Sequence, residues 1–370
     1  MSPTRVPPES TAQPPGRTVR KGRGAASNAE GRFEPHRHEL EDDGWGGFDE
    51  PLAAVATSVT IEAARTIISR NDSPDIPFDR SINPYRGCEH GCVYCYARPT
   101  HAYLGLSAGV DFETRLYVKP HAAALLRNEL RAPGYEPNVI ALGTNTDPYQ
   151  PIERRYRVTR SVLEVLAECD HPVTIVTKSG RIERDLDLLA PMAAKNLVQV
   201  YMSVTTLDSE LARRLEPRAS APARRIEAIR GLHRAGVPVG VMAAPVIPVL
   251  TDGELESILE AARGAGATSA GYVLLRLPYE VKDLFKQWLT VHAPLAAEHV
   301  MARVRDIRAG KENDAHFGTR MRGRGIYADL IRNRFQLACR RLGLVHRDRL
   351  QLDTSRFRPP SASGDQLNFL

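Results

Sequence analysis

Three cysteines stand close together in the chain, at Cys88, Cys92 and Cys95, with the spacing Cys-x3-Cys-x2-Cys. Three thiolates packed this tightly can hold three irons of a [4Fe-4S] cluster, and the fourth iron then stays open to bind a substrate or cofactor. Iron in such a cluster needs soft anionic ligands, which accounts for cysteine at all three positions. A structural zinc site is the alternative. It usually takes two separated ligand pairs, and its fourth ligand here would have to be His90, His101 or a distant cysteine.

From residue 81 onward, expected strands alternate with expected helices, and these elements must position the cysteine loop. Short β-branched runs predict strands, and the segments between them have helical periodicity. The expected strands cover residues 81–85, 138–142, 173–177, 198–204, 237–243 and 272–277. The expected helices cover residues 122–130, 158–168, 184–193, 223–235 and 253–263. Because each strand is followed by a helix, we expect an α/β fold whose parallel sheet forms a partial (β/α)6 barrel, with the active site at the carboxyl ends of the strands.

Composition divides the 370 residues into four parts. Residues 1–75 are rich in Pro, Gly, Ser and charge, and we expect most of them to be disordered. Residues 76–292 hold the α/β core. Residues 293–358 form a basic helical C-terminal region, with helices expected over 295–308 and 326–342, and residues 359–370 read as a flexible tail.

The chain contains no apolar run long enough for a membrane span and no signal-peptide core, so a cytoplasmic protein with no membrane association is expected. A reducing compartment also suits thiolates that carry a cluster. The two remaining cysteines, Cys169 and Cys339, are predicted to be small buried core residues.

Positive charge is distributed unevenly. The formal net charge is +6, and residues 301–358 contain fifteen Lys and Arg against six Asp and Glu. This region therefore predicts a polyanionic partner such as nucleic acid. The alternative is a set of helices whose arginines are simply solvated.

Five short motifs follow the expected strands in order. They are Gly143-Thr-Asn-Thr-Asp-Pro-Tyr149, Thr177-Lys-Ser179, Ser203-Val-Thr205, Leu215-Glu-Pro-Arg218 and Ala243-Ala-Pro-Val-Ile-Pro248. With the cysteine triplet, they resemble the radical S-adenosylmethionine (SAM) superfamily, in particular its spore photoproduct lyase-like branch, also called the DNA repair photolyase family. The resemblance covers about residues 83–278. It implies an enzyme with one [4Fe-4S] cluster that cleaves SAM reductively and generates a 5′-deoxyadenosyl radical.

The resemblance also implies roles for particular side chains. Lys178 and Ser203 match positions that contact SAM, and a lysine ammonium can pair with the SAM carboxylate. The other matches are Thr144, Asn145 and Thr146 at the SAM amino group, Pro245 and Ile247 beside the adenine, and Tyr94 and Tyr96 near the cluster and the radical path. Each of these residues also has an ordinary structural interpretation. Lys178 could be a surface lysine, Ser203 a strand serine that bonds nearby backbone, and residues 144–146 a turn. Pro245 and Ile247 could simply end a strand, and the two tyrosines could pack as aromatic rings.

One residue departs from the family pattern. Thr144 occupies the position of the cysteine that donates hydrogen in true spore photoproduct lyases. The O–H bond of a threonine is too strong for its hydrogen to be given to a carbon radical as a thiol hydrogen is. The resemblance therefore does not assign the thymine lesion of spores, which true spore photoproduct lyases repair, as the substrate. A lyase-like enzyme acting on nucleic acid is the favoured function. The alternatives are radical modification of a protein or small molecule, and a non-catalytic metal-binding adaptor.

Two protein partners are also expected. The last five residues, Gln366–Leu370, resemble the peptide with which bacterial replication and repair proteins bind the DNA sliding clamp, although the final Leu and Phe stand in reverse order. The superfamily further implies a reductant protein of the flavodoxin or ferredoxin type.

Overall fold

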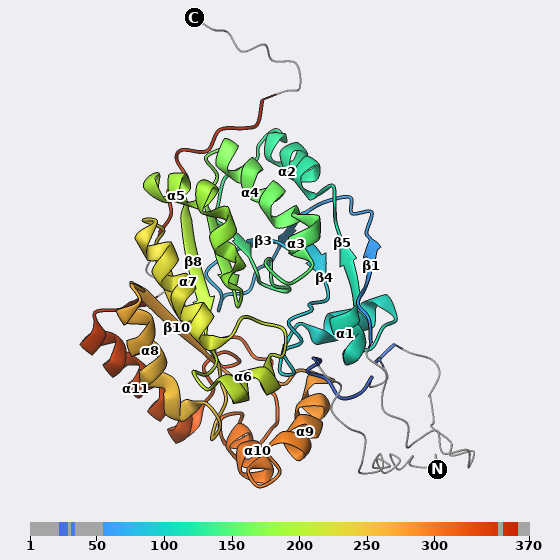
Figure 1. Cartoon of the computed structure of the whole chain (residues 1–370), viewed down its shortest axis with the longest axis vertical. Helices are drawn as coiled ribbons and strands as arrows, with labels where there is room; N and C mark the ends of the chain where they lie inside the picture. The colour runs from blue at the N-terminus through green and yellow to red at the C-terminus, as the bar shows by residue number, and fades with distance from the viewer. Residues whose placement is uncertain (1–21, 29–30, 34–54, 347–350, 362–370) are drawn as a thin grey trace, which may run out of the picture.

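Most strands belong to one curved sheet that carries helices on its outer side (Figure 1). The computed structural model describes residues 22–28, 31–33, 55–346 and 351–361. The clamp-like peptide at Gln366–Leu370 lies outside these residues. Within the described part, no helix is both long and apolar enough to cross a membrane.

The large sheet has eight strands in the order β11-β10-β9-β8-β7-β6-β3-β2, and all neighbours are parallel except β2 and β3. The strands are β2 (Ile68–Arg70), β3 (Arg80–Ile82), β6 (Ile140–Leu142), β7 (Val173–Thr177), β8 (Val198–Ser203), β9 (Val239–Val246), β10 (Ser269–Leu274) and β11 (Val345–His346). The central strand β8 is buried along its whole length, as expected for a parallel strand covered on both faces. The expected α/β fold with a parallel sheet is confirmed.

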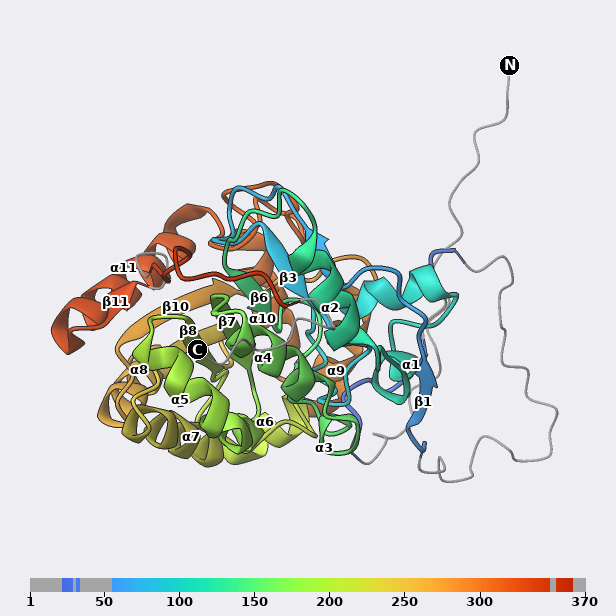
Figure 2. The same cartoon turned by 90° about the horizontal axis from the view of Figure 1, so that it is seen from above.

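The helices of the core are amphipathic and bury one face against the sheet. Figure 2 shows α5, α7 and α8 in an arc on the outer side of the strands. In α4, the buried residues include Val158, Val162, Leu163 and Leu166, which follow helical spacing. The core helices are α2 (Ala122–Arg131), α3 (Glu153–Tyr156), α4 (Val158–Glu168), η2 (Gly180–Asp185), α5 (Leu186–Ala194), α6 (Ser209–Leu215), α7 (Pro222–Arg234), η3 (Asp252–Glu254) and α8 (Leu255–Gly264).

A second, smaller sheet lies beside the first strand of the barrel. It has the order β1-β5-β4 and consists of β1 (Ser58–Ile61), β4 (Tyr85–Arg86) and β5 (Arg115–Val118), with η1 (Arg98–Leu104) and α1 (Val110–Thr114) before β5. The expected strand over residues 81–85 is therefore divided between two sheets. Pro84, which has no N–H to donate to a ladder, separates the two pieces. Strands β1 and β2 also lie inside the segment 1–75, where the sequence predicted mostly disorder.

The C-terminal helices are α9 (Val281–His292), α10 (Ala297–Asp306) and α11 (Gly325–Leu342). Helix α11 packs on α8 through Ile331, Phe335 and Ala338, which are buried in the main core.

Many arginines of this region bind carboxylates or carbonyls of the chain itself. Arg334 binds Glu256 at 2.6 Å, and Arg320 binds Asp75 at 2.5 Å. Arg308 is 1% exposed and donates to the carbonyls of Leu274 and Leu275. Other pairs are Arg303–Asp306, Arg305–Glu298, Arg332–Asp329, Arg341–Glu260 and Arg356–Asp353. Arg308, Arg320, Arg334 and Arg341 therefore tie this region to the rest of the chain, while the other arginines named here pair within their own helix or segment.

Candidate active site

The cysteine loop (residues 87–97) connects β4 to η1 and turns tightly. The Cys88 N–H donates to the Phe112 carbonyl at 2.9 Å, and the Cys95 N–H donates to the Cys92 carbonyl at 3.1 Å. Cys88 and Cys95 share one apolar cluster, and Cys92 and Cys95 share another, so Cys95 lies between the other two. Cys88 and Cys92 are buried, while Cys95 is half-buried. The loop therefore gathers three thiols in one enclosed place.

A fully buried ion pair lies next to the cysteine loop and bonds to its backbone. Arg98 and Glu113 are both 0% exposed, and their side chains meet at 2.5 Å. Arg98 also donates to the carbonyls of Gly91 and Cys92 in the cysteine loop. The Glu113 carboxylate also accepts the N–H groups of Gly24 and Ala25, at 2.9 and 2.8 Å. The approach is so close that a Cβ on Gly24 would lie 1.7 Å from the Gly91 carbonyl oxygen, so only glycine fits there.

Burial raises the pKa of all three thiols. For Cys92, the nearby Glu216 raises the pKa further, while Lys178 lowers it. Three enclosed thiols of this kind become good thiolate ligands only when a strongly positive group replaces their protons. Within the described ranges, no three His, Cys, Asp or Glu side chains converge around a single metal ion. The fit to an iron–sulfur cluster therefore rests on the soft donor set and its enclosure.

The side chains considered as a fourth zinc ligand make other contacts, although the buried Nδ1 of His101 has no partner among the described residues. His90 Nδ1 lies 3.3 Å from the Asp147 carboxylate, and His101 Nε2 lies 2.9 Å from the Arg115 carbonyl oxygen. Cys169 and Cys339 are buried in the main hydrophobic core, as predicted. The described residues thus bring none of the proposed fourth ligands into the cysteine triplet.

A polar network lies beside the cysteine loop, at the carboxyl ends of β7, β8 and β9. Parallel register places Thr177 opposite Met202 and Ser203 opposite Met242, so these strand ends are adjacent. Lys178 Nζ donates to Ser203 Oγ at 2.8 Å and to the Ala244 carbonyl oxygen at 3.1 Å. Burial lowers the pKa of Lys178 to about 8. The two residues expected to contact SAM therefore touch each other.

Glu216 joins this network to the cysteine loop, and the sequence reasoning did not single it out. Its carboxylate lies 3.1 Å from Lys178 Nζ and 2.6 Å from Thr205 Oγ1, and it also accepts from the Tyr94 hydroxyl and from Arg225. It is 2% exposed. A single buried carboxylate thus positions a lysine, a tyrosine and an arginine. The only sequence signal for it was its place in the Leu215–Arg218 motif.

Asp147 orders the neighbouring loop (residues 143–149). It accepts from the Lys178 N–H and from Thr177 Oγ1, both at 2.7 Å. Desolvation alone would raise the pKa of Asp147, but His90 and these hydrogen bonds hold it below its usual value. The carboxylate therefore stays ionised and ties the second strand end to the third.

The three residues matched to the SAM amino group lie on this same loop. The N–H groups of Asn145 and Thr146 face Asn83 Oδ1 at 3.1 and 3.5 Å, and the Thr146 hydroxyl donates to the Tyr85 carbonyl. The Thr144 carbonyl oxygen accepts from the Tyr96 hydroxyl. The loop is thus held by backbone and side-chain bonds to the segment that precedes the cysteines.

The remaining candidates lie in two different environments. Tyr94 is buried and bound to Glu216, whereas Tyr96 is 50% exposed. Ile247 is fully buried in the apolar cluster that contains Cys92 and Tyr94, and Pro245, two residues earlier, is half-buried. The predicted site residues therefore surround one edge of the barrel, with Tyr96 at its solvent side.

Comparison with known proteins gives this arrangement its context. Residues 82–262 match the family model of the Radical SAM superfamily. An uncharacterised protein of Mycobacterium tuberculosis is 41% identical over 227 residues, which cover 60% of this chain and 67% of that protein. An uncharacterised protein of Methanocaldococcus jannaschii is 27% identical over 173 residues, covering 47% of this chain and 62% of that protein.

Among solved structures, spore photoproduct lyase complexed with dinucleoside spore photoproduct has a TM-score of 0.56 at 15% identity, covering 78% of this chain and 80% of that chain. A substituted spore photoproduct lyase with bound AdoMet and the same dinucleoside has the same TM-score and coverage at 16% identity. The chain belongs to the radical SAM superfamily, and its fold is similar to that of spore photoproduct lyase.

Proposed function

We propose that the protein is a radical SAM enzyme that carries one [4Fe-4S] cluster on Cys88, Cys92 and Cys95 and acts on nucleic acid. The chemistry that this cluster and SAM supply when bound is hydrogen abstraction by a 5′-deoxyadenosyl radical. One observation carries the proposal. The enclosed cysteine loop shares a buried polar network with Lys178 and Ser203, at the strand ends where a parallel barrel holds its ligands.

The residues of the network would act by binding and orienting. Lys178 offers an ammonium group that can pair with the SAM carboxylate, and Ser203 offers a hydroxyl to a carboxylate or ribose oxygen. Glu216 fixes the position of Lys178 and of the Tyr94 ring before any ligand arrives. The loop that carries Thr144, Asn145 and Thr146 would border the SAM amino group, and Pro245 and Ile247 would border the adenine. Such preorganisation lowers the entropy that binding must overcome.

Nucleic acid is supported as the substrate class by two observations. The chain has a formal net charge of +6, and its fold is similar to that of an enzyme solved with a dinucleoside photoproduct. Thr144, however, offers no thiol as hydrogen donor. Repair of the thymine photoproduct by thiol quenching is therefore not part of the proposal. We expect the enzyme to act in the cytoplasm with a flavodoxin- or ferredoxin-type reductant.

Anaerobic reconstitution with iron and sulfide tests the function. The wild-type protein should form 5′-deoxyadenosine from SAM under reduction, and the rate should rise with DNA or RNA. Lys178→Met should keep its iron but lose SAM binding in equilibrium dialysis. Lys195→Met is the matched control, because Lys195 is 45% exposed and pairs only with Asp170 in the described structure. A reconstituted protein that forms no 5′-deoxyadenosine with or without nucleic acid would refute the proposal.

A further inference from the structure

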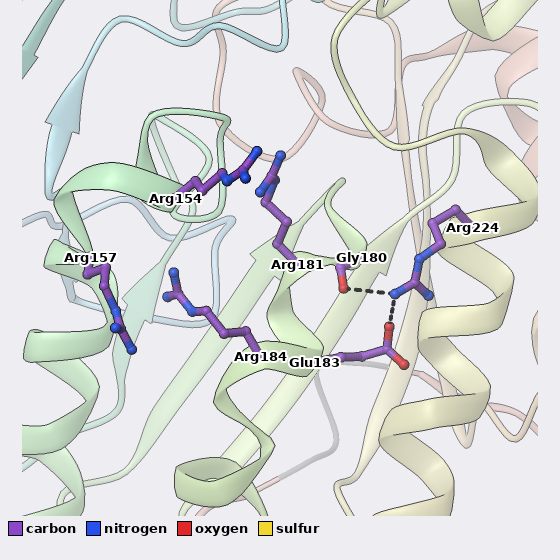
Figure 3. Close-up of a pocket in the computed structure, with 7 residues that line it drawn as sticks. All are labelled: Arg154, Arg157, Gly180, Arg181, Glu183, Arg184 and Arg224. Atoms are coloured by element: carbon purple, nitrogen blue, oxygen red, sulfur yellow. Dashed lines mark hydrogen bonds and ion pairs between the residues drawn. The ribbon is translucent and has the colours of Figure 1, made fainter.

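A basic cleft of about 560 Å³ opens between α3, η2 and the first turn of α7 (Figure 3). We call it the arginine cleft. Glu183 and the backbone of Gly180 line it together with five arginines, Arg154, Arg157, Arg181, Arg184 and Arg224. In Figure 3, the side chains of Arg154 and Arg181 extend toward each other from opposite walls. The lining thus contains five positive charges against one negative charge.

The five arginines differ in whether their guanidinium groups pair with a carboxylate. Arg184 binds the buried carboxylates of Glu153 and Asp185, at 2.8 and 2.9 Å, and Arg224 binds Glu183. The other three, Arg154, Arg157 and Arg181, are exposed and make no side-chain hydrogen bond or ion pair with any described residue. The cleft therefore holds three unpaired guanidinium groups. The arginines of the C-terminal helices described above are mostly paired.

The position of Arg157 follows from a helix end. Arg157 ends α3 and precedes α4 with φ of 52°, and its N–H donates to the Glu153 carbonyl at 3.1 Å. A left-handed residue is common at such a helix end, because its N–H can then bond back to the last turn. The turn between the two helices thus places the Arg157 side chain at the cleft.

The chemistry of the cleft fits phosphate. A guanidinium group presents N–H donors in a planar fork that matches two phosphate oxygens. No aliphatic or aromatic residue lines the cleft, whereas a protein-docking surface usually has an apolar centre. Convergent like charges in a concave site are stabilised by a multivalent anion.

The cleft is continuous in sequence with the candidate active site. Gly180 stands two residues after Lys178, and its N–H donates to Ser220 Oγ at 3.0 Å, while the Ser220 N–H donates to the Lys178 carbonyl at 3.2 Å. We propose that the arginine cleft binds phosphate groups of the nucleic-acid substrate and so places a nucleotide at the rim of the active site. This inference rests on the proposed function for its substrate class, but its geometry stands independently.

Fluorescence anisotropy on the anaerobically reconstituted full chain tests the proposal. One ligand is a labelled single-stranded oligonucleotide of about ten nucleotides, and the other is a labelled mononucleotide, each titrated between about 50 and 200 mM salt. The cleft variant combines Arg154→Gln, Arg157→Gln and Arg181→Gln. The control variant combines Arg303→Gln, Arg332→Gln and Arg340→Gln on α10 and α11, and so loses the same net charge elsewhere.

On single-stranded nucleic acid, each phosphate contact contributes about 0.7 to the slope of log K against log salt concentration. The cleft variant loses three contacts, so its slope should be smaller by about 2. Its affinity for the oligonucleotide should be about 100-fold weaker near 0.1 M salt. The control variant should bind within about threefold of wild type. A loss confined to the mononucleotide arm would still support a phosphate site but would identify a single nucleotide as the ligand. Equal losses in both variants would overturn the proposal in favour of overall charge. A cleft variant that binds both ligands normally but is no longer reduced by flavodoxin would overturn it in favour of protein docking.

The rate of 5′-deoxyadenosine formation without nucleic acid separates this result from the proposed function. It should be unchanged in the cleft variant. A wild-type protein that makes none would refute the proposed activity while leaving the binding comparison intact.

Discussion

The buried ion pair of Arg98 and Glu113 should control both stability and iron retention. Removing one partner of a buried pair leaves the other charge without compensation and typically costs about 3–5 kcal/mol. Both side chains are 0% exposed, so solvent screening does not reduce this figure. Arg98→Met would also remove the side-chain donor of the Gly91 carbonyl and one of the two donors of the Cys92 carbonyl. Since folded proteins are stable by about 5–15 kcal/mol, we expect Arg98→Met to lose about a fifth or more of its stability.

Urea unfolding followed by circular dichroism measures this loss, and iron per chain after anaerobic reconstitution measures the effect on the cysteine loop. Arg98→Lys keeps the charge but cannot span the same acceptors, so it should lie between wild type and Arg98→Met. The double variant Arg98→Met with Glu113→Gln should lose less than the sum of the two single variants, because it leaves neither charge alone.

Arg303→Met is the matched control, because Arg303 pairs with Asp306 at an exposed position and such pairs contribute about 0–1 kcal/mol. An Arg98→Met protein within about 0.5 kcal/mol of wild type, with full iron content, would refute the reasoning.

Alanine at any of the three loop cysteines should abolish the iron–sulfur absorption and 5′-deoxyadenosine formation, whereas alanine at the core residues Cys169 or Cys339 should keep both; a loop variant with full absorption would contradict the cluster assignment. Burial lowers the pKa of His171 to about 4, against 6.5 in the unfolded chain. His171 should thus not reduce the free energy of unfolding above pH 6.5. As the pH falls toward 4, protonation of the unfolded chain at His171 should lower that free energy by about 3 kcal/mol. His171→Gln should flatten the pH dependence of the urea midpoint in that window, and identical curves would contradict the prediction. A labelled peptide of the last ten residues should bind the sliding clamp with roughly micromolar affinity. Alanine at both Leu367 and Phe369 should remove the signal, and if both peptides behave alike the clamp is no partner.

The sequence predicted the core of the fold because its strands and helices have strong local patterns. The strand at Val173–Thr177 and the helix at Val158–Glu168 were predicted with the observed bounds. The strand at Ser269–Leu274 was placed three residues too late, because its first residues are small and lack a β-branched signature. The strand at Ser58–Ile61 was missed because it is short and largely exposed, and its partner β5 lies far along the chain. Pairing between distant segments leaves no local sequence signal.

Candidate site residues could be proposed from the sequence where the residue type itself indicates the chemistry. They could not be proposed where the role depends on burial and on neighbours that are distant in the chain. The cysteine triplet and Lys178 stand out by type and position. Glu216 does not, because sequence cannot show that a glutamate in a motif is 2% exposed and faces a lysine, a tyrosine and an arginine. The same limit applies to charge. Residues 301–358 are rich in arginine, but only the structure shows that many of these arginines bind carboxylates of the chain. Three arginines whose side chains pair with no described residue, Arg154, Arg157 and Arg181, instead line the cleft.

The long-range bond between Tyr94 and Glu216 also bears on how the protein is made. The two residues are 122 positions apart in the chain, so the wall of the cysteine loop is synthesised well after the loop itself. At about 5–20 residues per second, the ribosome needs on the order of ten seconds to cover that distance. During this interval, the nascent chain carries three thiols while the later part of their enclosure, including Leu215 and Glu216, does not yet exist. Oxidation of these thiols during synthesis is therefore a hazard that the folded protein, with its buried loop, no longer faces.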